Sequence, residues 1–144
     1  MITAFNHVGI SVSDLERSIA FYRDLLSLQV IQEVQFEGAR YESILALRGA
    51  KGRIAVLRSG NFELELFEFE RPAARPMDPN RPVSDRGISH FALQVEDLNG
   101  VYGRLLAAGV SFHCPPIDFG CAISTYLRDP DGNVIEMLQL PAAA

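Results

Sequence analysis

Apolar and polar residues alternate along two short stretches of this chain, and the two stretches resemble each other. Residues 7–15 read HVGISVSDL, and residues 90–98 read HFALQVEDL, 83 positions later. Apolar side chains at every second position predict a strand with one packed face. The Asp-Leu pair that follows begins a helical pattern in each copy. The same order of His, strand and helix in both halves indicates an internal repeat.

The first copy continues with a helix and three further strands. Apolar residues recur at helical spacing from Leu15 to Leu26, and a capping-box start at residues 13–16 supports a helix that ends near Ser27. Residues 42–50 are predicted to form a short helix or a loop. The strands of this copy are expected at 5–12, 29–36, 52–58 and 61–69.

The second copy repeats this order after a stretch rich in proline. Residues 70–87 contain four prolines and are predicted to be a linker, because proline cannot continue a strand ladder or a helix. A helix is expected at 97–108, closed by Gly109. The strands of this copy are expected at 88–95, 110–114, 122–128 and 133–140.

The pattern therefore predicts an α+β fold made of two tandem βαβββ modules, residues 1–69 and residues 88–144, within one domain spanning residues 1–144. Length and composition agree with a packed domain. A chain of 144 residues can bury a sizeable core without disulfides. Its 48% hydrophobic and 22% charged residues are typical of globular proteins.

Charge and cysteine content exclude several classes of protein. The net charge of −5 disfavours nucleic acid or an anionic membrane as a partner, because both attract basic surfaces. No apolar run approaches the roughly 18 residues that span a bilayer, and the N-terminus lacks a signal-peptide pattern. Cys114 and Cys121 offer neither a disulfide framework nor a CxxC motif. We expect a cytoplasmic protein with no membrane or nucleic-acid partner.

Two histidines occupy matching positions at the start of the repeated strands. Side chains alternate across a strand, so His7 shares a face with Gly9 and Ser11, opposite the branched residues that suit packing beneath the helix. His90 occupies the same position in the second copy. Each module is therefore expected to place one imidazole on the face turned away from its helix.

Glutamates occur on the last strand of each module. Glu63 and Glu65 share one face in the first module, where a solvated edge strand is the alternative interpretation. Glu136 lies between Val134 and Leu138, and a carboxylate in such apolar surroundings is costly without a partner. Two imidazoles and two carboxylates that converge would suit a divalent first-row metal.

The paired βαβββ modules, with His7, Glu65, His90 and Glu136 so placed, resemble the vicinal oxygen chelate superfamily. That group includes glyoxalase I, extradiol dioxygenases and bleomycin-resistance proteins. The resemblance extends from HVGISVSDLERSIAFYRDLL to RDPDGNVIEMLQL. It implies that the modules form a half-barrel cup in which these four residues hold one divalent metal ion, which could be Ni, Zn, Co, Mn or Fe.

The resemblance implies a metal-dependent lyase or isomerase of the glyoxalase I type. Such an enzyme binds a small molecule through two adjacent oxygens and stabilises an enediolate by bidentate chelation. Glu136 or Glu65 would carry the proton, with Glu136 favoured, since the histidines are committed to the metal. A homodimer is expected, because association can cover open sheet edges.

Three alternatives belong to the same superfamily: an extradiol-type ring-cleaving dioxygenase, an enzyme like methylmalonyl-CoA epimerase, and a drug-sequestering resistance protein without catalysis. The extradiol enzymes use two His and one Glu and have no ligand at the position of Glu65. The epimerases usually have Gln there, and the bleomycin-binding members generally lack the metal ligands. The set of four residues therefore favours the glyoxalase type.

Overall fold

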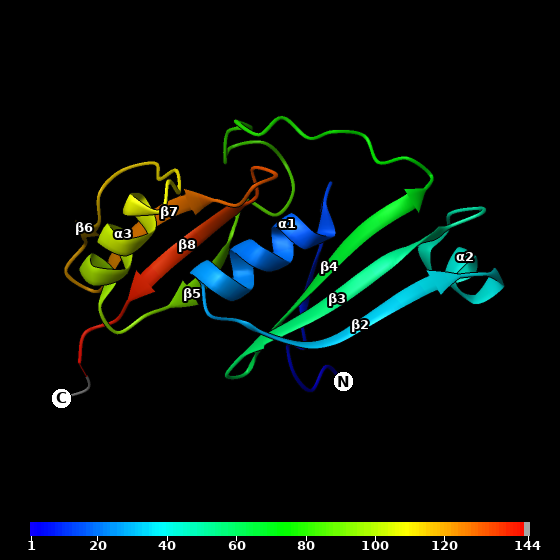
Figure 1. Cartoon of the computed structure of the whole chain (residues 1–144). Helices are drawn as coiled ribbons and strands as arrows, with labels where there is room; N and C mark the ends of the chain where they lie inside the picture. Colours follow the sequence, from blue (N-terminus) through cyan, green and yellow to red (C-terminus); the bar gives the residue numbers. More distant parts are fainter. Residues whose placement is uncertain (143–144) are drawn as a thin grey trace. The chain divides into compact units, whose positions relative to one another are not determined.

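The computed structural model describes residues 1–142, so the last two residues of the predicted second module lie outside the described part. The chain divides into two compact units, which meet at Pro76 and Met77 in the sequence. Each unit contains one four-stranded mixed sheet and follows the order βαβββ (Figure 1). The predicted α+β class and the two βαβββ modules are confirmed. Within residues 1–142, no helix is long and apolar enough to span a bilayer.

The first unit contains a sheet with the strand order β1-β4-β3-β2. Strand β1 is parallel to β4, and the other neighbouring strands are antiparallel. A single π-helical turn, η1, continues α1, and α2 lies between β2 and β3 in the chain. The elements are β1 (Val8–Ser11), α1 (Leu15–Ala20), η1 (Phe21–Leu25), β2 (Gln29–Glu37), α2 (Ala39–Leu45), β3 (Lys51–Ser59) and β4 (Phe62–Arg71).

The second unit has the same topology in a shorter chain. Its sheet has the order β5-β8-β7-β6, with β5 parallel to β8 and the other pairs antiparallel. The elements are β5 (Phe91–Gln94), α3 (Leu98–Ala107), β6 (Ile117–Asp118), β7 (Ile123–Arg128) and β8 (Val134–Gln139).

Two sequence predictions differ from the structure. The strand expected at 110–114 does not form, and Phe112 makes only an isolated bridge to Leu127. Pro115 and Pro116 follow directly and cannot donate to a ladder, so the edge strand of this sheet is the two-residue β6. The ambiguous stretch 42–50 contributes to helix α2, which begins three residues earlier than expected.

Each helix packs on one face of the sheet in its own unit. Helix α1 packs against β3 and β4, and α3 packs against β8. The apolar residues on this side are almost fully buried, as the alternation of the strands predicts. They include Leu15, Ile19, Leu57, Leu64 and Leu66 in the first unit, and Leu98, Leu105, Leu127, Ile135 and Met137 in the second.

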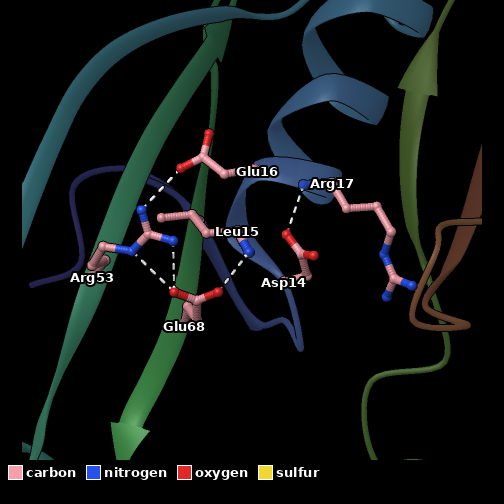
Figure 2. Close-up of polar contacts among 6 residues, drawn as sticks. All are labelled: Asp14, Leu15, Glu16, Arg17, Arg53 and Glu68. Atoms are coloured by element: carbon pink, nitrogen blue, oxygen red, sulfur yellow. Dashed lines mark hydrogen bonds and ion pairs between the residues drawn. The ribbon is translucent and has the colours of Figure 1, made fainter.

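The start of helix α1 is held by two carboxylates (Figure 2). Asp14, the N-cap residue, accepts a hydrogen bond from the Arg17 amide at 2.9 Å. Glu68, on β4, accepts one from the Leu15 amide at 2.9 Å through Oε1. Its Oε2 accepts two from Arg53, at 3.0 Å from Nε and 2.8 Å from Nη2. The bonds from the Leu15 and Arg17 amides satisfy donors that a helix leaves unpaired at its start. The two carboxylates also place negative charge where the helix dipole favours it.

The second unit repeats this arrangement with a neutral side chain. Asp97 caps α3 and accepts from the Gly100 amide at 3.0 Å. Gln139 Oε1, on β8, accepts from the Leu98 amide at 2.8 Å. The repeat therefore includes the hydrogen bond that fastens each helix to the last strand of its sheet, and this bond does not require a charge.

Replacing Glu68 tests what this bond contributes. Glu68→Ala should lower the free energy of unfolding by about 1–3 kcal/mol, because the amide of the buried Leu15 loses its acceptor. Glu68→Gln should cost less than about 1 kcal/mol, because it retains an acceptor oxygen and loses only a partly exposed ion pair. Urea unfolding followed by circular dichroism measures both changes.

A matched control lies on the same two strands. Glu63 also pairs with an arginine, Arg58, and its side chain is 27% exposed, as is that of Glu68. Among residues 1–142, the hydrogen-bond donor to Glu63 is Arg58 and not a helix amide, so Glu63→Ala should be close to neutral. Equal losses for Glu63→Ala and Glu68→Ala would show that the helix bond adds nothing.

Candidate functional site

One histidine and one glutamate lie together in the first unit. His7 directly precedes β1, and Glu65 lies in the middle of β4. The parallel register pairs Gly9 with Glu65, and a residue two positions before Gly9 shares its face. The Nε2 atom of His7 is 3.5 Å from Oε2 of Glu65.

The second unit forms the same pair by the same register. Ala92 of β5 pairs with Glu136 of β8, and His90 lies two residues before Ala92. The Nε2 atom of His90 is 3.3 Å from Oε2 of Glu136. The repeat noticed in the sequence therefore has a structural meaning: each copy presents one imidazole and one carboxylate side by side.

The spacing within each pair suits two ligands of one metal ion. Donor atoms that bind a metal at about 2.0–2.2 Å, at angles between 90° and the tetrahedral angle, are about 2.8–3.6 Å apart. Both Nε2–Oε2 distances, 3.5 Å and 3.3 Å, fall in this range. Each pair can therefore serve as two adjacent ligands.

The second ring nitrogen of each histidine contacts the residue just before it. Nδ1 of His7 is 2.7 Å from Oδ1 of Asn6, and Nδ1 of His90 is 2.9 Å from Oγ of Ser89. The contact with Asn6 engages Nδ1 of His7 and leaves Nε2 as the ring nitrogen beside Glu65. Histidines that bind metals are commonly oriented in this way.

The two pairs differ in their surroundings. In the second unit, Ser124 Oγ donates a hydrogen bond to Glu136 Oε1 at 2.6 Å, and the Tyr126 hydroxyl is 3.4 Å from His90 Nε2. Burial raises the pKa of the Tyr126 phenol, and the charge of Glu136 raises it further. The second pair is also the less exposed, with side-chain exposures of 29% for His90 and 19% for Glu136.

In the first unit, apolar side chains of β3 lie beside the glutamate, at the positions where β7 of the second unit has hydroxyl groups; we call these side chains the apolar wall. Val56 pairs with Glu65 across β3 and β4, and Ile54 pairs with Phe67. A cluster of buried and half-buried side chains continues this wall toward α2, with Phe36, Ala50 and Ile54 at its centre and Val34, Tyr41, Leu45, Leu47, Val56, Phe67 and Phe69 packed against it. His7 and Glu65 are more open than the second pair, at 42% and 26% side-chain exposure.

His113 lies beside the second pair without joining it. Its backbone amide donates to the Tyr126 carbonyl at 2.8 Å, and the two rings are 5.8 Å apart. Burial lowers the pKa of His113, and the positive charge of Arg128 lowers it further, so the imidazole is neutral at neutral pH. The two cysteines have other surroundings than His90 and Glu136. Cys114 is half-buried and contacts Thr125, and Cys121 is exposed.

A hollow of about 650 Å³ in the first unit is lined by other residues. Its charged side chains are already paired: Arg53 with Glu68, Lys51 with Glu70, and Glu37 with Arg71. None of the four predicted ligands lines it. Within residues 1–142, no three His, Cys, Asp or Glu side chains gather at metal-binding spacing, and each unit by itself presents one His–Glu pair.

Sequence reasoning identified both members of each pair but missed the groups around them. Ser124 and Tyr126 share a face of β7 by alternation, and this was visible in the sequence. Their position beside Glu136 depends on the antiparallel register of β7 and β8, which alternation alone does not fix. The contacts from Asn6 and Ser89 involve the residue before each histidine, and no motif marks them.

The chain is similar in sequence to two lactoylglutathione lyases. The chain is 28% identical to the lactoylglutathione lyase of Pseudomonas aeruginosa, over 94% of this chain and 81% of that protein. It is 26% identical to the lactoylglutathione lyase of Haemophilus influenzae, over 92% and 90%.

Solved structures share the fold. A glyoxalase family protein from Bacillus cereus superimposes with a TM-score of 0.89 at 21% identity, over 97% of this chain and 95% of that one. The fosfomycin resistance protein FosX from Listeria monocytogenes, solved with Mn(II) and sulfate, gives 0.66 at 17% identity, over 99% and 96%. At such identities these likenesses concern the fold alone.

A family model covers nearly the whole chain. The model of the Glyoxalase/Bleomycin resistance protein/Dioxygenase superfamily matches residues 4–137, which include both His–Glu pairs. The resemblance inferred from the sequence is thus confirmed. The chain belongs to the glyoxalase/bleomycin resistance protein/dioxygenase superfamily.

Proposed function

We propose that this protein is a divalent-metal-dependent lyase or isomerase of the glyoxalase type. The observation that carries the proposal is the repeated pair, in which each unit presents one histidine Nε2 beside one glutamate Oε2 through the same strand register. His7, Glu65, His90 and Glu136 would together hold one metal ion. The proposal requires the two pairs to meet, either within one chain or between two copies of it.

The donor set fits a first-row divalent ion such as Ni, Zn, Co, Mn or Fe. Imidazole and carboxylate both bind these metals, and two carboxylates would balance the charge of the ion. With Nδ1 of His7 in contact with Asn6, Nε2 is the ring nitrogen that would bind the metal. When bound, the metal ion would supply Lewis acidity toward two adjacent oxygens of a small substrate.

Glu136 is the residue that we propose moves the proton. Its side chain is 19% exposed and lies between Val134, which is buried, and Leu138, which is half-buried, so little water competes for its oxygens. The carboxylate would accept a proton from the carbon beside a carbonyl and return it to the neighbouring carbon. Glu65, in its apolar wall, is the alternative carrier.

The relatives suggest which substrate to test first. Two of them are named lactoylglutathione lyases and match over 81% and 90% of their own length. We therefore propose the hemithioacetal of methylglyoxal and glutathione as the first substrate. It carries the two adjacent oxygens that the site would chelate.

Removing one imidazole tests the metal site. Purified without chelator, the wild-type protein should carry about one divalent ion per chain. His90→Ala should lose most of this metal, because one ligand has been removed. Inductively coupled plasma mass spectrometry measures the content. His113→Ala is the matched control, since it removes a nearby histidine that has no carboxylate partner. Full occupancy in His90→Ala would contradict the assignment.

Replacing Glu136 tests the proton carrier separately. Glu136→Gln keeps an oxygen near the metal but removes the base, so metal content should largely remain while product formation falls by at least about a hundredfold. Exchange of the substrate proton in deuterated water, followed by NMR, should fall in parallel. Glu63→Gln is the control, because Glu63 lies on the same strand as Glu65 and pairs with Arg58. Undiminished exchange in metal-loaded Glu136→Gln would transfer the role to Glu65 or exclude this chemistry.

We also propose a homodimer. The outer strands of each four-stranded sheet, such as β2 and β6, have one edge without a strand partner in that sheet. Apolar side chains are exposed on both, Ile31 on β2 at 42% and Ile117 on β6 at 47%. Association covers such edges. Sedimentation velocity should give twice the chain mass of 15.9 kDa. A fully active monomer would exclude a site formed between two copies.

A further inference from the structure

The two carboxylate oxygens of Glu136 have different partners. Oε1 accepts a hydrogen bond from the Ser124 hydroxyl at 2.6 Å, and Oε2 lies 3.3 Å from Nε2 of His90. Ser124 is 7% exposed, so water has little access to this bond. Hydrogen bonds to a charged oxygen are among the stronger ones in proteins. One oxygen of this carboxylate is therefore held, and the other is left facing the histidine.

The pairing of β7 with β8 places Ser124 next to Glu136. Ser124 lies on β7 two residues before Tyr126, which is the register partner of Glu136 on β8. Residues two apart on a strand share a face, so the hydroxyl lies diagonally across from the carboxylate. Both strands are central in the sheet order, between β5 and β6. The bond thus depends on sheet pairing and not on a loop.

The first unit has an apolar residue at the position of Ser124. The position that matches Ser124 is Ile54, which pairs with Phe67 as Ser124 pairs with Leu138. Ile54 is 8% exposed and belongs to the apolar cluster. Within residues 1–142, Glu65 forms its ion pair with His7, and Ile54 offers no hydroxyl at the position of Ser124. The two carboxylates therefore differ in the side chain at this matching position, as they also do at the position of Val56 and Tyr126.

We propose that Ser124 is a positioning residue for Glu136. By holding Oε1, it makes Oε2 the single oxygen that the carboxylate offers to a metal ion and to the substrate proton. This inference rests on the proposed function, because it assigns a role toward the same metal site. It adds that Glu136 binds through one oxygen and that its orientation is set before the metal arrives.

The physical consequence is a gain in metal affinity. Without the hydroxyl, the carboxylate is free to rotate about its last torsion angle, and ordering it would cost conformational entropy on binding. Groups that orient metal ligands commonly change metal affinity 10–100-fold when they are removed. The Ser124→Ala variant should keep its fold, since alanine fits the same strand position and removes one oxygen atom.

The experiment measures Ni²⁺ affinity by calorimetry in competition with a chelator. Ser124→Ala should bind Ni²⁺ about tenfold more weakly than the wild-type protein. Ser124→Thr, which restores a hydroxyl, should recover most of the affinity. A melting curve of each variant, recorded without metal, separates loss of ligand orientation from loss of stability.

Thr125→Val is the matched control. Thr125 is the next residue on β7, is 3% exposed, and donates a hydrogen bond of the same length, 2.6 Å, to the Cys114 carbonyl on the other face. Its loss should lower the melting temperature and leave Ni²⁺ affinity unchanged. Equal weakening by Thr125→Val and Ser124→Ala would overturn the positioning role, because the effect would then come from the strand in general.

The outcomes separate this inference from the function on which it rests. If Ser124→Ala binds Ni²⁺ as tightly as the wild-type protein while His90→Ala does not bind it, the metal site stands and the positioning role is wrong. If the wild-type protein binds no Ni²⁺, Mn²⁺ or Zn²⁺, both proposals are wrong. Weaker binding by Ser124→Ala alone, recovered by Ser124→Thr, supports the inference.

Discussion

The parallel pairing of the first and last strands of each unit is the constraint on which the candidate site depends. Glu65 has Gly9 as its partner, and Glu136 has Ala92. In each case a histidine lies two residues before the partner, so the register alone brings imidazole and carboxylate to one face. A slip of one residue would turn each glutamate toward the packed helix side, where an unpaired carboxylate is costly.

Several bonds at the helix start maintain this register. The strand β1 is only four residues long, and the backbone amide of Val12, just after it, donates to the Phe67 carbonyl at 2.8 Å. Three residues later, the Leu15 amide donates to Glu68. In the second unit, the Val95 amide donates to the Leu138 carbonyl at 2.8 Å, and the Leu98 amide donates to Gln139. The helix caps therefore also tie the first strand to the last, and stability and site geometry have a common origin.

The sequence could predict those features that depend on periodicity. Alternation indicated the strands and placed His7 and His90 on the faces opposite the helices, and the helical spacing located α1 and α3. Alternation could not separate Glu63 from Glu65, which share a face. The family resemblance pointed to Glu65, and strand pairing gives the physical reason, because it places Glu65 beside His7 and Glu63 beside Arg58.

Other features depend on contacts that no local pattern encodes. The strand expected at 110–114 had suitable residues, but the two prolines after it prevent the ladder from continuing. The role of Glu68 at the helix start was not visible, because the residues that it joins are 53 positions apart in the chain. The same holds for Ser124, which reaches Glu136 only through the register of β7 and β8.

The two units share some features around the His–Glu pair and differ in others. Both copies retain the His–Glu pair, the parallel register and the acceptor at the helix start, although that acceptor is charged in Glu68 and neutral in Gln139. The side chains beside the carboxylates differ, with Val56 opposite Glu65 and Tyr126 opposite Glu136. Backbone pairing thus supplies two equivalent His–Glu pairs, while neighbouring side chains make the two carboxylates unequal. Within residues 1–142, the ion-pair partner of Glu65 is His7, whereas Glu136 has His90 at Oε2 and the Ser124 hydroxyl at Oε1, so the two carboxylates have unequal surroundings.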